Sequence, residues 1–342
     1  MSIRELAKLT GTSPTAVSLI LNNRPHRYAP ATVERVREAA EKNHYVPSIY
    51  AQTMRTKRFN NVFVIKGARP GESTFNQIVE TSFHRELSAQ GFRMGLAFVE
   101  DEAFADPQFL VRVRRNWQCD GFVFAYNFPG PERLRQHVAS DPFPCVWFNQ
   151  KFRFDAVHPD NAGGASALTR AMIEAGHRDI AFVGPGPKAG GEPPHFSAED
   201  REAAYRAAME AARLKPRVIA PSAAGPVDLR SELGGLLDQK KGPTGWIFYH
   251  AGQAKCFVSA ALERGCQIPR DFSVGTFGIS AEAWDSGFRI TYAIEYFDRM
   301  GESLAKMLVA KILDPDRKIP TVKVPMDLRK GCETIAPPRR GA

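Results

Sequence analysis

The chain has 342 residues, a length that exceeds one ordinary domain and predicts two or more folded units. With 43% hydrophobic, 24% charged and 10% aromatic residues, its composition is that of a globular protein and excludes a mainly disordered chain. The formal net charge of +9 is compatible with a nucleic-acid partner, with an acidic membrane surface, or with nothing beyond solubility.

The excess positive charge is concentrated near the N-terminus. Residues 1–59 hold ten Lys and Arg residues against four Asp and Glu residues, a net charge of +6, which leaves only +3 for the rest of the chain. This distribution predicts a small nucleic-acid-binding head on a nearly neutral body. The alternative is a solvated basic face without a partner.

The cysteines and the first residues indicate a reducing compartment. Five cysteines are an odd number without a C-x-x-C pair, which argues against a disulfide framework and against a thiolate zinc site. The N-terminus lacks an apolar signal core, and no run approaches the roughly 18 apolar residues of a membrane-spanning helix. We therefore expect neither export nor membrane insertion.

The first 45 residues predict three short helices. Each has a recognisable start, namely a capping box formed by Ser2 and Glu5, an N-cap at Ser13 followed by Pro14, and a proline at position 30. A glycine-containing turn separates the first two helices. Two short helices joined in this way are the helix-turn-helix pattern, and the third helix allows one compact core.

From residue 61 on, strands and helices alternate. The expected strands are 62–65, 94–99, 121–125, 145–148, 180–183, 217–220, 246–249 and 272–277, and the expected helices are 75–90, 106–117, 160–175, 198–212, 229–239 and 252–264. Such alternation predicts parallel sheets covered by helices on both faces. The pattern restarts at residue 160, which predicts two consecutive α/β units.

Five segments of the first sixty residues match one family pattern in order. They are SIRELAKLTGTS at 2–13, AVS at 16–18, LNN at 21–23, YVPS at 45–48 and AQTMRT at 51–56. With these residues the chain closely resembles the DNA-binding head of the LacI/GalR family of bacterial repressors. The resemblance implies a helix-turn-helix that reads the major groove and a hinge helix that folds in the minor groove when two subunits meet on a palindromic operator.

The body resembles the periplasmic-binding-protein-like effector domain of the same family. The matching segments are DGFVF at 120–124, DN at 160–161, GHRDIAFVG at 176–184, Arg201 ahead of YRAA at 205–208, IPRDFSV at 268–274 and LRKGCET at 328–334. The resemblance implies two lobes with a small-molecule cleft between them. It also implies that the chain crosses between the lobes near residues 159, 290 and 320.

The expected fold is therefore multidomain. An all-α three-helix head with a hinge helix precedes an α/β two-lobed, periplasmic-binding-protein-like domain made of two parallel-sheet, Rossmann-like subdomains. The expected boundaries are 1–46 for the helix-turn-helix domain, 47–59 for the hinge helix and linker, and 60–342 for the effector-binding and dimerisation domain, with an N-lobe at 60–159 and 291–320 and a C-lobe at 160–290 and 321–336.

The second helix is expected to contact DNA. Side chains near its N-terminus reach base edges, and the candidates are Ser13, Pro14, Thr15, Ala16, Ser18 and Leu19, with Asn22 placed for the DNA backbone. Thr15 can donate or accept a hydrogen bond, whereas Leu19 can only pack on thymine methyl groups or exclude bases by shape. Many family members carry a long polar residue at Leu19, so either the operator departs from the common half-site or Leu19 belongs partly to the core.

The hinge segment supplies a second set of expected DNA contacts. It is too short to be a stable helix alone, so it should order only when bound. Met54 stands where the family usually has a leucine that wedges into a minor-groove step, although Met54 can instead pack on its own protein. Arg55 and Lys57 are expected on phosphates.

Arg201 is the main candidate for the cleft. The family's arginine at this position binds ligand hydroxyls or carboxylates, which suits its fixed donors, and the alternative is a surface arginine paired with Glu199 or Glu202. We expect it one turn into a helix capped by Ser197. Four further residues follow strands and can stack on or hydrogen-bond a sugar-sized ligand, namely Phe75, Tyr126, Asn149 and Tyr249.

Two positions depart from the family pattern. His250 and Gly278 stand where many relatives have carboxylates that bind sugar hydroxyls. Either the ligand is not a typical neutral sugar, for example an acid matched by Arg201 and His250, or effector binding has degenerated. A lone histidine such as His250 can titrate in a cleft but is more often structural.

Together these features predict a cytoplasmic, nucleoid-associated transcriptional regulator that binds double-stranded operator DNA. We expect a repressor that binds a palindromic operator as a homodimer, with a tetramer as the alternative, and whose affinity is modulated by a sugar-like or sugar-acid effector. No catalytic motif is present, so we expect no enzyme, no cofactor and no metal site. The remaining alternatives are a regulator with a degenerate effector site and, with less support, a solute-binding receptor.

Overall fold

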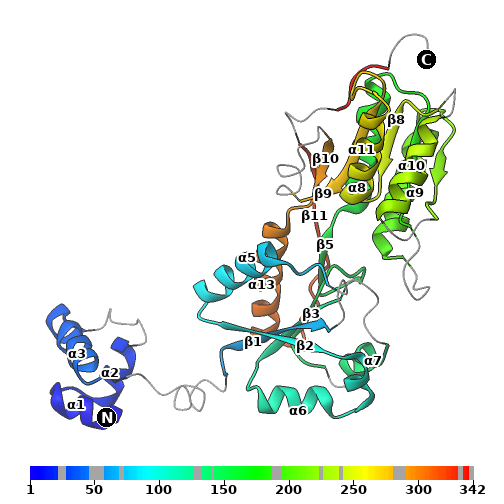
Figure 1. Ribbon diagram of the computed structural model, residues 1–342. Helices are drawn as coiled ribbons and strands as arrows, with labels where there is room; N and C mark the ends of the chain where they lie inside the picture. Colours follow the sequence, from blue (N-terminus) through cyan, green and yellow to red (C-terminus); the bar gives the residue numbers. More distant parts are fainter. Residues whose placement is uncertain are drawn as a thin grey trace.

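The computed structural model consists of a helical head and an α/β body (Figure 1). It describes residues 1–21, 28–45, 58–68, 73–126, 132–140, 142–186, 194–222, 226–238, 242–279, 290–329 and 334–338. Within these residues, no helix combines the length and apolar character needed to cross a membrane. Cys119, Cys145, Cys256 and Cys266 carry free thiols.

The head contains the expected helices α1 (Ile3–Leu9), α2 (Pro14–Leu21) and α3 (Pro30–Lys42). The predicted capping box is present, since the backbone N–H of Glu5 donates to Ser2 Oγ and the N–H of Ser2 donates to the Glu5 carboxylate. The three described helices enclose a small apolar core of Leu6, Ala7, Val17, Ile20, Val36 and Ala40. This core is enough to orient α2 against its neighbours.

Among the described residues, six parallel strands form the first sheet of the body, in the order β11-β5-β4-β3-β1-β2. They are β1 (Asn61–Gly67), β2 (Arg93–Val99), β3 (Gly121–Ala125), β4 (Cys145–Phe148), β5 (Ala156–Pro159) and β11 (Val322–Val324). Two apolar clusters cover its faces. One contains α5 (Gln77–Ala89) and α13 (Phe297–Leu313), and the other contains α6 (Phe109–Asn116), α7 (Glu132–Ser140) and the 3₁₀ helix η2 (Asp101–Ala105).

The second sheet has the order β12-β10-β9-β8-β6-β7 in the described part of the chain. Its strands are β6 (Ile180–Val183), β7 (Arg217–Ile219), β8 (Gly245–Phe248), β9 (Ser273–Gly278), β10 (Thr291–Ile294) and β12 (Asp327–Leu328). All neighbours pair in parallel except β12, which is antiparallel to β10. One face is covered by α8 (Asn161–Glu174) and α9 (Phe196–Ala211), and the other by α10 (Pro226–Gly235), the 3₁₀ helix η4 (Leu236–Asp238) and α11 (Ala251–Glu263).

The chain passes between the two sheets three times in the described residues. The first passage follows β5 at Pro159, as expected. The other two come later than residues 290 and 320, because β10 still pairs with β9 of the second sheet as far as Ile294 and β11 still pairs with β5 of the first sheet as far as Val324. A strand must complete its ladder before the chain can leave the sheet.

Candidate functional site

The N-terminal end of α2 presents the side chains expected to contact DNA. Ser13, Pro14 and Thr15 are exposed, and Ser13 caps the helix because its Oγ accepts from the backbone N–H of Ala16 at 3.1 Å. Ala16 is buried in the head and faces its core rather than solvent. Ser18 and Leu19 are half-buried, so Leu19 contributes to packing and still reaches the surface. The predicted contacts at Asn22, Met54, Arg55 and Lys57 lie outside the described residues.

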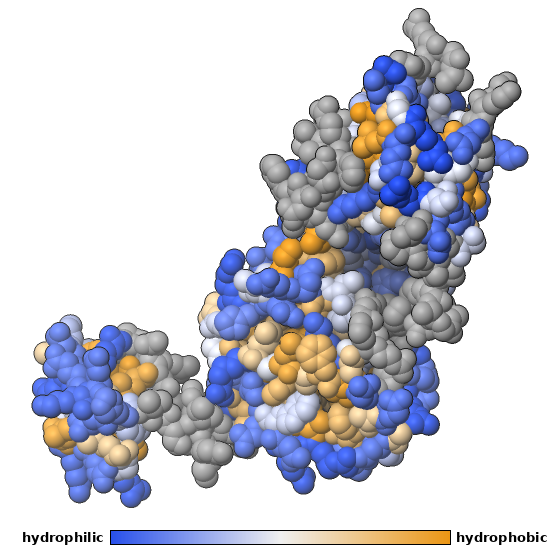
Figure 2. All heavy atoms as spheres, viewed as in Figure 1, coloured by the Kyte–Doolittle hydropathy of each residue, from blue (hydrophilic) through white to orange (hydrophobic). Residues whose placement is uncertain are grey.

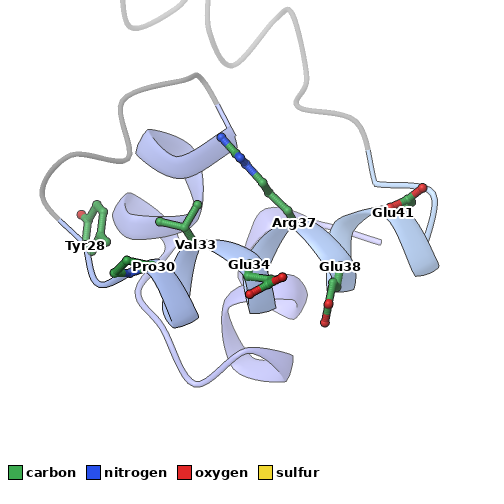
Figure 3. A pocket seen from close by; sticks show the side chains of 7 residues that line it. All are labelled: Tyr28, Pro30, Val33, Glu34, Arg37, Glu38 and Glu41. Carbon is green, nitrogen blue, oxygen red and sulfur yellow. The ribbon is translucent and has the colours of Figure 1, made fainter.

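The outer face of α3 carries more negative than positive side chains. A shallow groove there is lined by Tyr28, Pro30, Val33, Glu34, Arg37, Glu38 and Glu41 (Figure 3). Its three carboxylates outnumber the single guanidinium, and a surface of that kind repels phosphates. The electrostatics therefore favour the α2 end of the head, and not this groove, as the face toward a nucleic acid.

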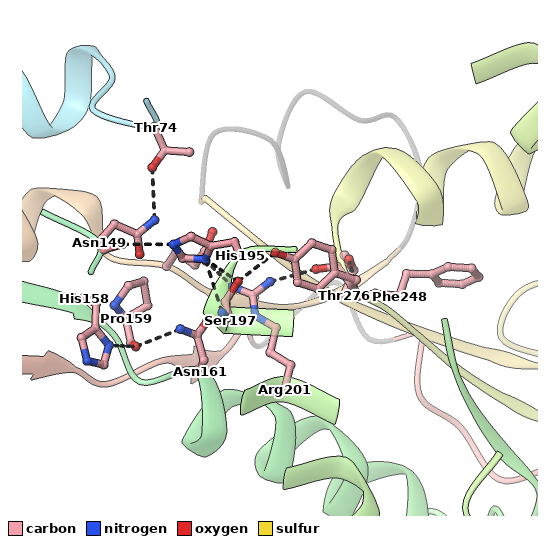
Figure 4. A network of polar contacts seen from close by, with 12 residues as sticks. Thr74, Asn149, His158, Pro159, Asn161, His195, Ser197, Arg201, Phe248 and Thr276 are labelled. Carbon is pink, nitrogen blue, oxygen red and sulfur yellow. Dashed lines mark hydrogen bonds and ion pairs between the residues drawn. The ribbon is translucent and has the colours of Figure 1, made fainter. Parts of the chain in front are cut away.

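In the body, Arg201 lies at the centre of a buried polar network at the carboxyl ends of the strands (Figure 4). Its Nε donates to Asn161 Oδ1 at 2.9 Å, one terminal nitrogen donates to the Tyr249 carbonyl oxygen at 2.8 Å, and the other contacts the Glu295 carboxylate at 2.6 Å. Arg201 is only 5% exposed. The network thus joins the start of α8, the end of β8 and the end of β10.

Two aromatic rings flank the same guanidinium. The Arg201 guanidinium carbon lies 4.1 Å from the centroid of the Phe277 ring and 5.2 Å from that of the Tyr249 ring. The alternative of a surface arginine paired with Glu199 or Glu202 is wrong, because Arg201 is buried and Glu202 accepts instead from Arg206 at 2.8 Å. The carboxylate that Arg201 does hold belongs to Glu295, far along the chain.

A second network begins at His195, which precedes α9. The expected cap at Ser197 is wrong: α9 begins at Phe196, and the His195 ring nitrogen Nδ1 accepts from the Ser197 backbone N–H. The hydroxyl of Ser197 lies 2.8 Å from the Tyr249 hydroxyl. A histidine serves as the cap here because its Nδ1 reaches the first free amides of the helix as a serine oxygen does.

The His195 network also connects the two sheets. His195 Nε2 donates to the backbone oxygen of Asn149 at 3.0 Å, and the Asn149 amide donates to Thr74 Oγ1 at 3.3 Å (Figure 4). Asn149 directly follows β4 and has φ +54°, a conformation that asparagine tolerates. An exposed ion pair of 2.5 Å between Lys151 and Asp200 adds a second link across the same gap.

The predicted cleft residues divide into two groups. Asn149, Tyr249 and Arg201 are brought together in the networks just described. Phe75, in contrast, is fully buried and packs edge-on against Phe83 and Phe148. Tyr126 is 4% exposed and its carbonyl accepts from the side chain of Gln150, so both rings lie inside the first lobe.

His250 begins α11 as a helix cap. Its Nδ1 accepts from the backbone N–H of Gln253 at 3.4 Å, and the His250 backbone N–H donates to Gln253 Oε1 at 3.3 Å. The residue is exposed, yet surrounding protein desolvates its ring and lowers its pKa, and the charge of Arg201 lowers the pKa further. The lowered pKa favours the neutral form of His250 near pH 7 while no anion lies beside it.

Comparisons with known proteins show what the chain resembles. The periplasmic binding protein-like domain model matches residues 169–331. The HTH-type transcriptional repressor PurR of Aliivibrio fischeri (strain MJ11) is 24% identical over 331 residues, which are 93% of this chain and 93% of that protein. The match is long enough to include at least part of the helical head. The resemblance to regulators of this kind, seen first in the sequence, is confirmed over most of the chain.

Solved structures agree with this fold over nearly the whole chain. The Lac repressor dimer bound to operator and the anti-inducer ONPF has a TM-score of 0.72 at 18% identity and covers 98% of this chain and 99% of its own. The transcriptional regulator CelR in complex with cellobiose has a TM-score of 0.63 at 21% identity and covers 96% and 98%. The predicted fold class is confirmed, and the curated proteins that match over most of the chain are transcriptional regulators.

Two residues of the site, His195 and Glu295, were not predicted from the sequence. Glu295 directly follows β10, and an acidic residue at the carboxyl end of a buried strand was a usable signal. Because β10 pairs with β9, Glu295 lies beside Gly278, and its backbone N–H donates to the Gly278 carbonyl at 2.9 Å. Glu295 therefore supplies a carboxylate beside the strand end that carries Gly278.

Three histidines give the protein a predicted dependence of stability on pH. Desolvation is the largest cause that lowers the pKa of His158, His177 and His250 below the usual 6.5. The unfolded chain then binds more protons than the folded chain, so the free energy of unfolding should fall as the pH falls below about 6.5. Urea unfolding at several pH values measures this.

The variant His177→Gln isolates one share of that effect. His177 is fully buried, donates from Nε2 to the Ala336 carbonyl at 2.8 Å and accepts from Thr244 Oγ1 at 2.9 Å. The variant should be less stable at pH 7 but should lose less stability between pH 7 and pH 5 than the wild type. An identical pH slope in both proteins would show that His177 is not among the groups responsible.

Proposed function

We propose that the protein is a homodimeric repressor that binds a palindromic operator and whose affinity changes when a small sugar-like effector occupies the cleft of the body. The observation that carries the proposal is the Arg201 network at the strand ends of the second sheet, together with the His195 network that links it to Asn149 at the end of β4 in the first sheet. The same chain exposes the start of α2. Ligands of two-lobed α/β proteins bind at such strand ends. A ligand that binds this link more tightly in one arrangement of the two sheets shifts the population toward that arrangement.

An exposed apolar edge supports the homodimer. Strand β2 lies at the edge of the first sheet, and on it Leu96 is 40% exposed and Phe98 is 63% exposed. Figure 2 shows apolar side chains gathered around this part of the body. Edge strands with large apolar side chains tend to be covered by another chain, and a second copy gives a closed twofold dimer.

The similarity to a regulator solved with cellobiose supports a sugar-like effector. The site offers what a sugar requires, namely hydroxyl and amide groups at Ser197, Asn149 and Tyr249 and an aromatic ring beside them. We propose that the protein acts on the chromosome in the cytoplasm. Its proposed parts are a DNA-binding head at residues 1–46, a hinge at 47–59 and an effector domain at 60–342. A thermal-shift screen of sugars, sugar acids and phosphates identifies the effector class.

Substitutions in the head test the DNA-binding part. Thr15→Ala and Met54→Ala should each weaken binding to the specific operator by about 1–3 kcal/mol, the scale of one lost base contact or groove wedge. Thr15 is exposed at the start of α2, so its removal leaves the head core intact. Gel-shift titration with a binding site selected from random DNA measures the loss.

Substitutions in the hinge give the contrasting control. Arg55→Ala and Lys57→Ala should lower affinity for all DNA sequences alike and make that affinity depend less on salt. A protein with one phosphate contact fewer displaces fewer counterions from the DNA. If Thr15→Ala and Met54→Ala both bind the selected site as tightly as the wild type, α2 and the hinge do not read DNA in the way proposed.

A further inference from the structure

The ion pair between Arg201 and Glu295 is unusual for a residue expected to hold a ligand, because the guanidinium already has a carboxylate. The two side chains are 6% and 17% exposed, and the atoms in contact are 2.6 Å apart. A charged hydrogen bond of this length in a desolvated site is among the stronger polar contacts in proteins. The positive charge of Arg201 is thus already matched within the chain.

The backbone holds Glu295 rigidly at this place. It lies between β10 and α13, where the chain passes from the second sheet to the first. Its N–H donates to the Gly278 carbonyl at 2.9 Å and its carbonyl accepts from Phe297 at 3.1 Å. Because its backbone is held on both sides, only the side-chain torsions of Glu295 are ordered when its carboxylate contacts Arg201.

Arg201 retains some donors for a ligand. A guanidinium has five N–H groups, and three are used on Asn161, Tyr249 and Glu295. One N–H on each terminal nitrogen remains. An acidic ligand that used these donors would bring a second carboxylate beside Glu295, and the repulsion between two like charges in a desolvated site would oppose its binding. A hydroxyl oxygen can accept from the remaining N–H groups while the ion pair stays intact.

We propose that Glu295 is a specificity-determining residue that fills the carboxylate site of Arg201 from within the chain, so that the cleft takes uncharged polyhydroxyl effectors and excludes acids. The ligand class rests on the proposed function of the cleft, whereas the filling of the Arg201 site by Glu295 does not. A free acid competes poorly with Glu295 for Arg201, because its association costs translational and rotational entropy that a side chain of the same chain does not lose.

Acetate, the simplest free carboxylate, tests this directly. The variant Glu295→Gln keeps the shape of the side chain and removes its charge, which opens the site to an external anion. The thermal midpoint is followed while acetate replaces chloride at constant ionic strength, and the apparent Kd for acetate is derived from the shift. We expect acetate to bind Glu295→Gln at least about tenfold more tightly than the wild type, the factor expected from one charged contact.

Two further variants serve as controls. Glu202→Gln lies on the same helix as Arg201 but removes the partner of the exposed Arg206, so it should gain no acetate affinity. The double variant Arg201→Met with Glu295→Gln should lose the gain, because the guanidinium that binds acetate is absent. A gain in Glu202→Gln equal to that in Glu295→Gln would mean general anion binding and would overturn the proposal.

The remaining outcomes are equally decisive. If acetate binds Glu295→Gln no more tightly than the wild type, Glu295 does not fill an anion site and the proposal fails. If Glu295→Gln is unfolded in chloride, a cooperative transition restored by acetate supports the proposal, and none in acetate overturns it. Operator binding of the wild type is measured in a separate experiment. If the proposed function is wrong, operator binding is absent, whereas the acetate result for Glu295→Gln does not depend on operator binding.

Discussion

Arg201→Ala should lower the free energy of unfolding by about 3 kcal/mol, the scale of a buried ion pair that loses one partner. The loss arises because Glu295 remains 17% exposed with no counter-ion, and because Asn161 and the Tyr249 carbonyl lose their donor. Urea unfolding followed by circular dichroism measures it, with an unchanged m-value as the sign that stability alone has changed.

Arg206→Ala is the matched control on the same helix. Arg206 is 45% exposed and pairs with Glu202 four residues earlier, so its removal should cost less than about 0.5 kcal/mol. Equal small losses in both variants would contradict the buried network around Arg201. The size of the Arg201 effect also means that a ligand screen with Arg201→Ala must be run at a temperature where the variant is folded.

Gly301→Val should lower the free energy of unfolding by about 3 kcal/mol, at the upper end of the usual cost of overpacking. Helices α5 and α13 approach each other at this glycine. A Cβ atom at Gly301 would lie 2.6 Å from the Val79 carbonyl oxygen and 2.9 Å from the Phe83 backbone nitrogen, and backbone atoms cannot move aside as a flexible side chain can. Thermal and urea unfolding both report the loss.

Gly235→Ala provides the control for a helical glycine. Gly235 ends α10, and an added Cβ there meets no atom within 4 Å. This substitution should leave stability unchanged or raise it by up to about 1 kcal/mol, through the better helix propensity of alanine. If Gly301→Val were as harmless as Gly235→Ala, the close packing of α5 against α13 would be wrong.

Several strands were predictable because burial on both faces leaves a continuous apolar run. The strands at 121–125, 145–148 and 180–183 have the predicted bounds, since a parallel strand between two helix layers is apolar throughout.

Strands β5, β10, β11 and β12 and helices α7 and α13 were not predicted. In α7, Leu134 is the only buried side chain in the described residues, so this helix has no apolar stripe to detect.

The site was predictable only in part. A position just after a strand identifies Asn149 and Tyr249 as residues of the site. It does not tell which side chains turn into the core, and the rings of Phe75 and Tyr126 are buried in the first lobe. Glu295 is 94 positions from Arg201, and only the order of strands in the second sheet brings the two together. Pairings that depend on topology in this way cannot be derived from local patterns.

Operator recognition is tested most directly by the selection of binding sites from random duplex DNA with the full-length protein. We expect enrichment of an inverted repeat, because two heads related by a twofold axis read two half-sites in opposite directions. Affinity for the enriched site should fall steeply with salt concentration. A bound pool in which no sequence is enriched, or the absence of binding at low salt, would contradict the assignment of this chain as an operator-binding repressor.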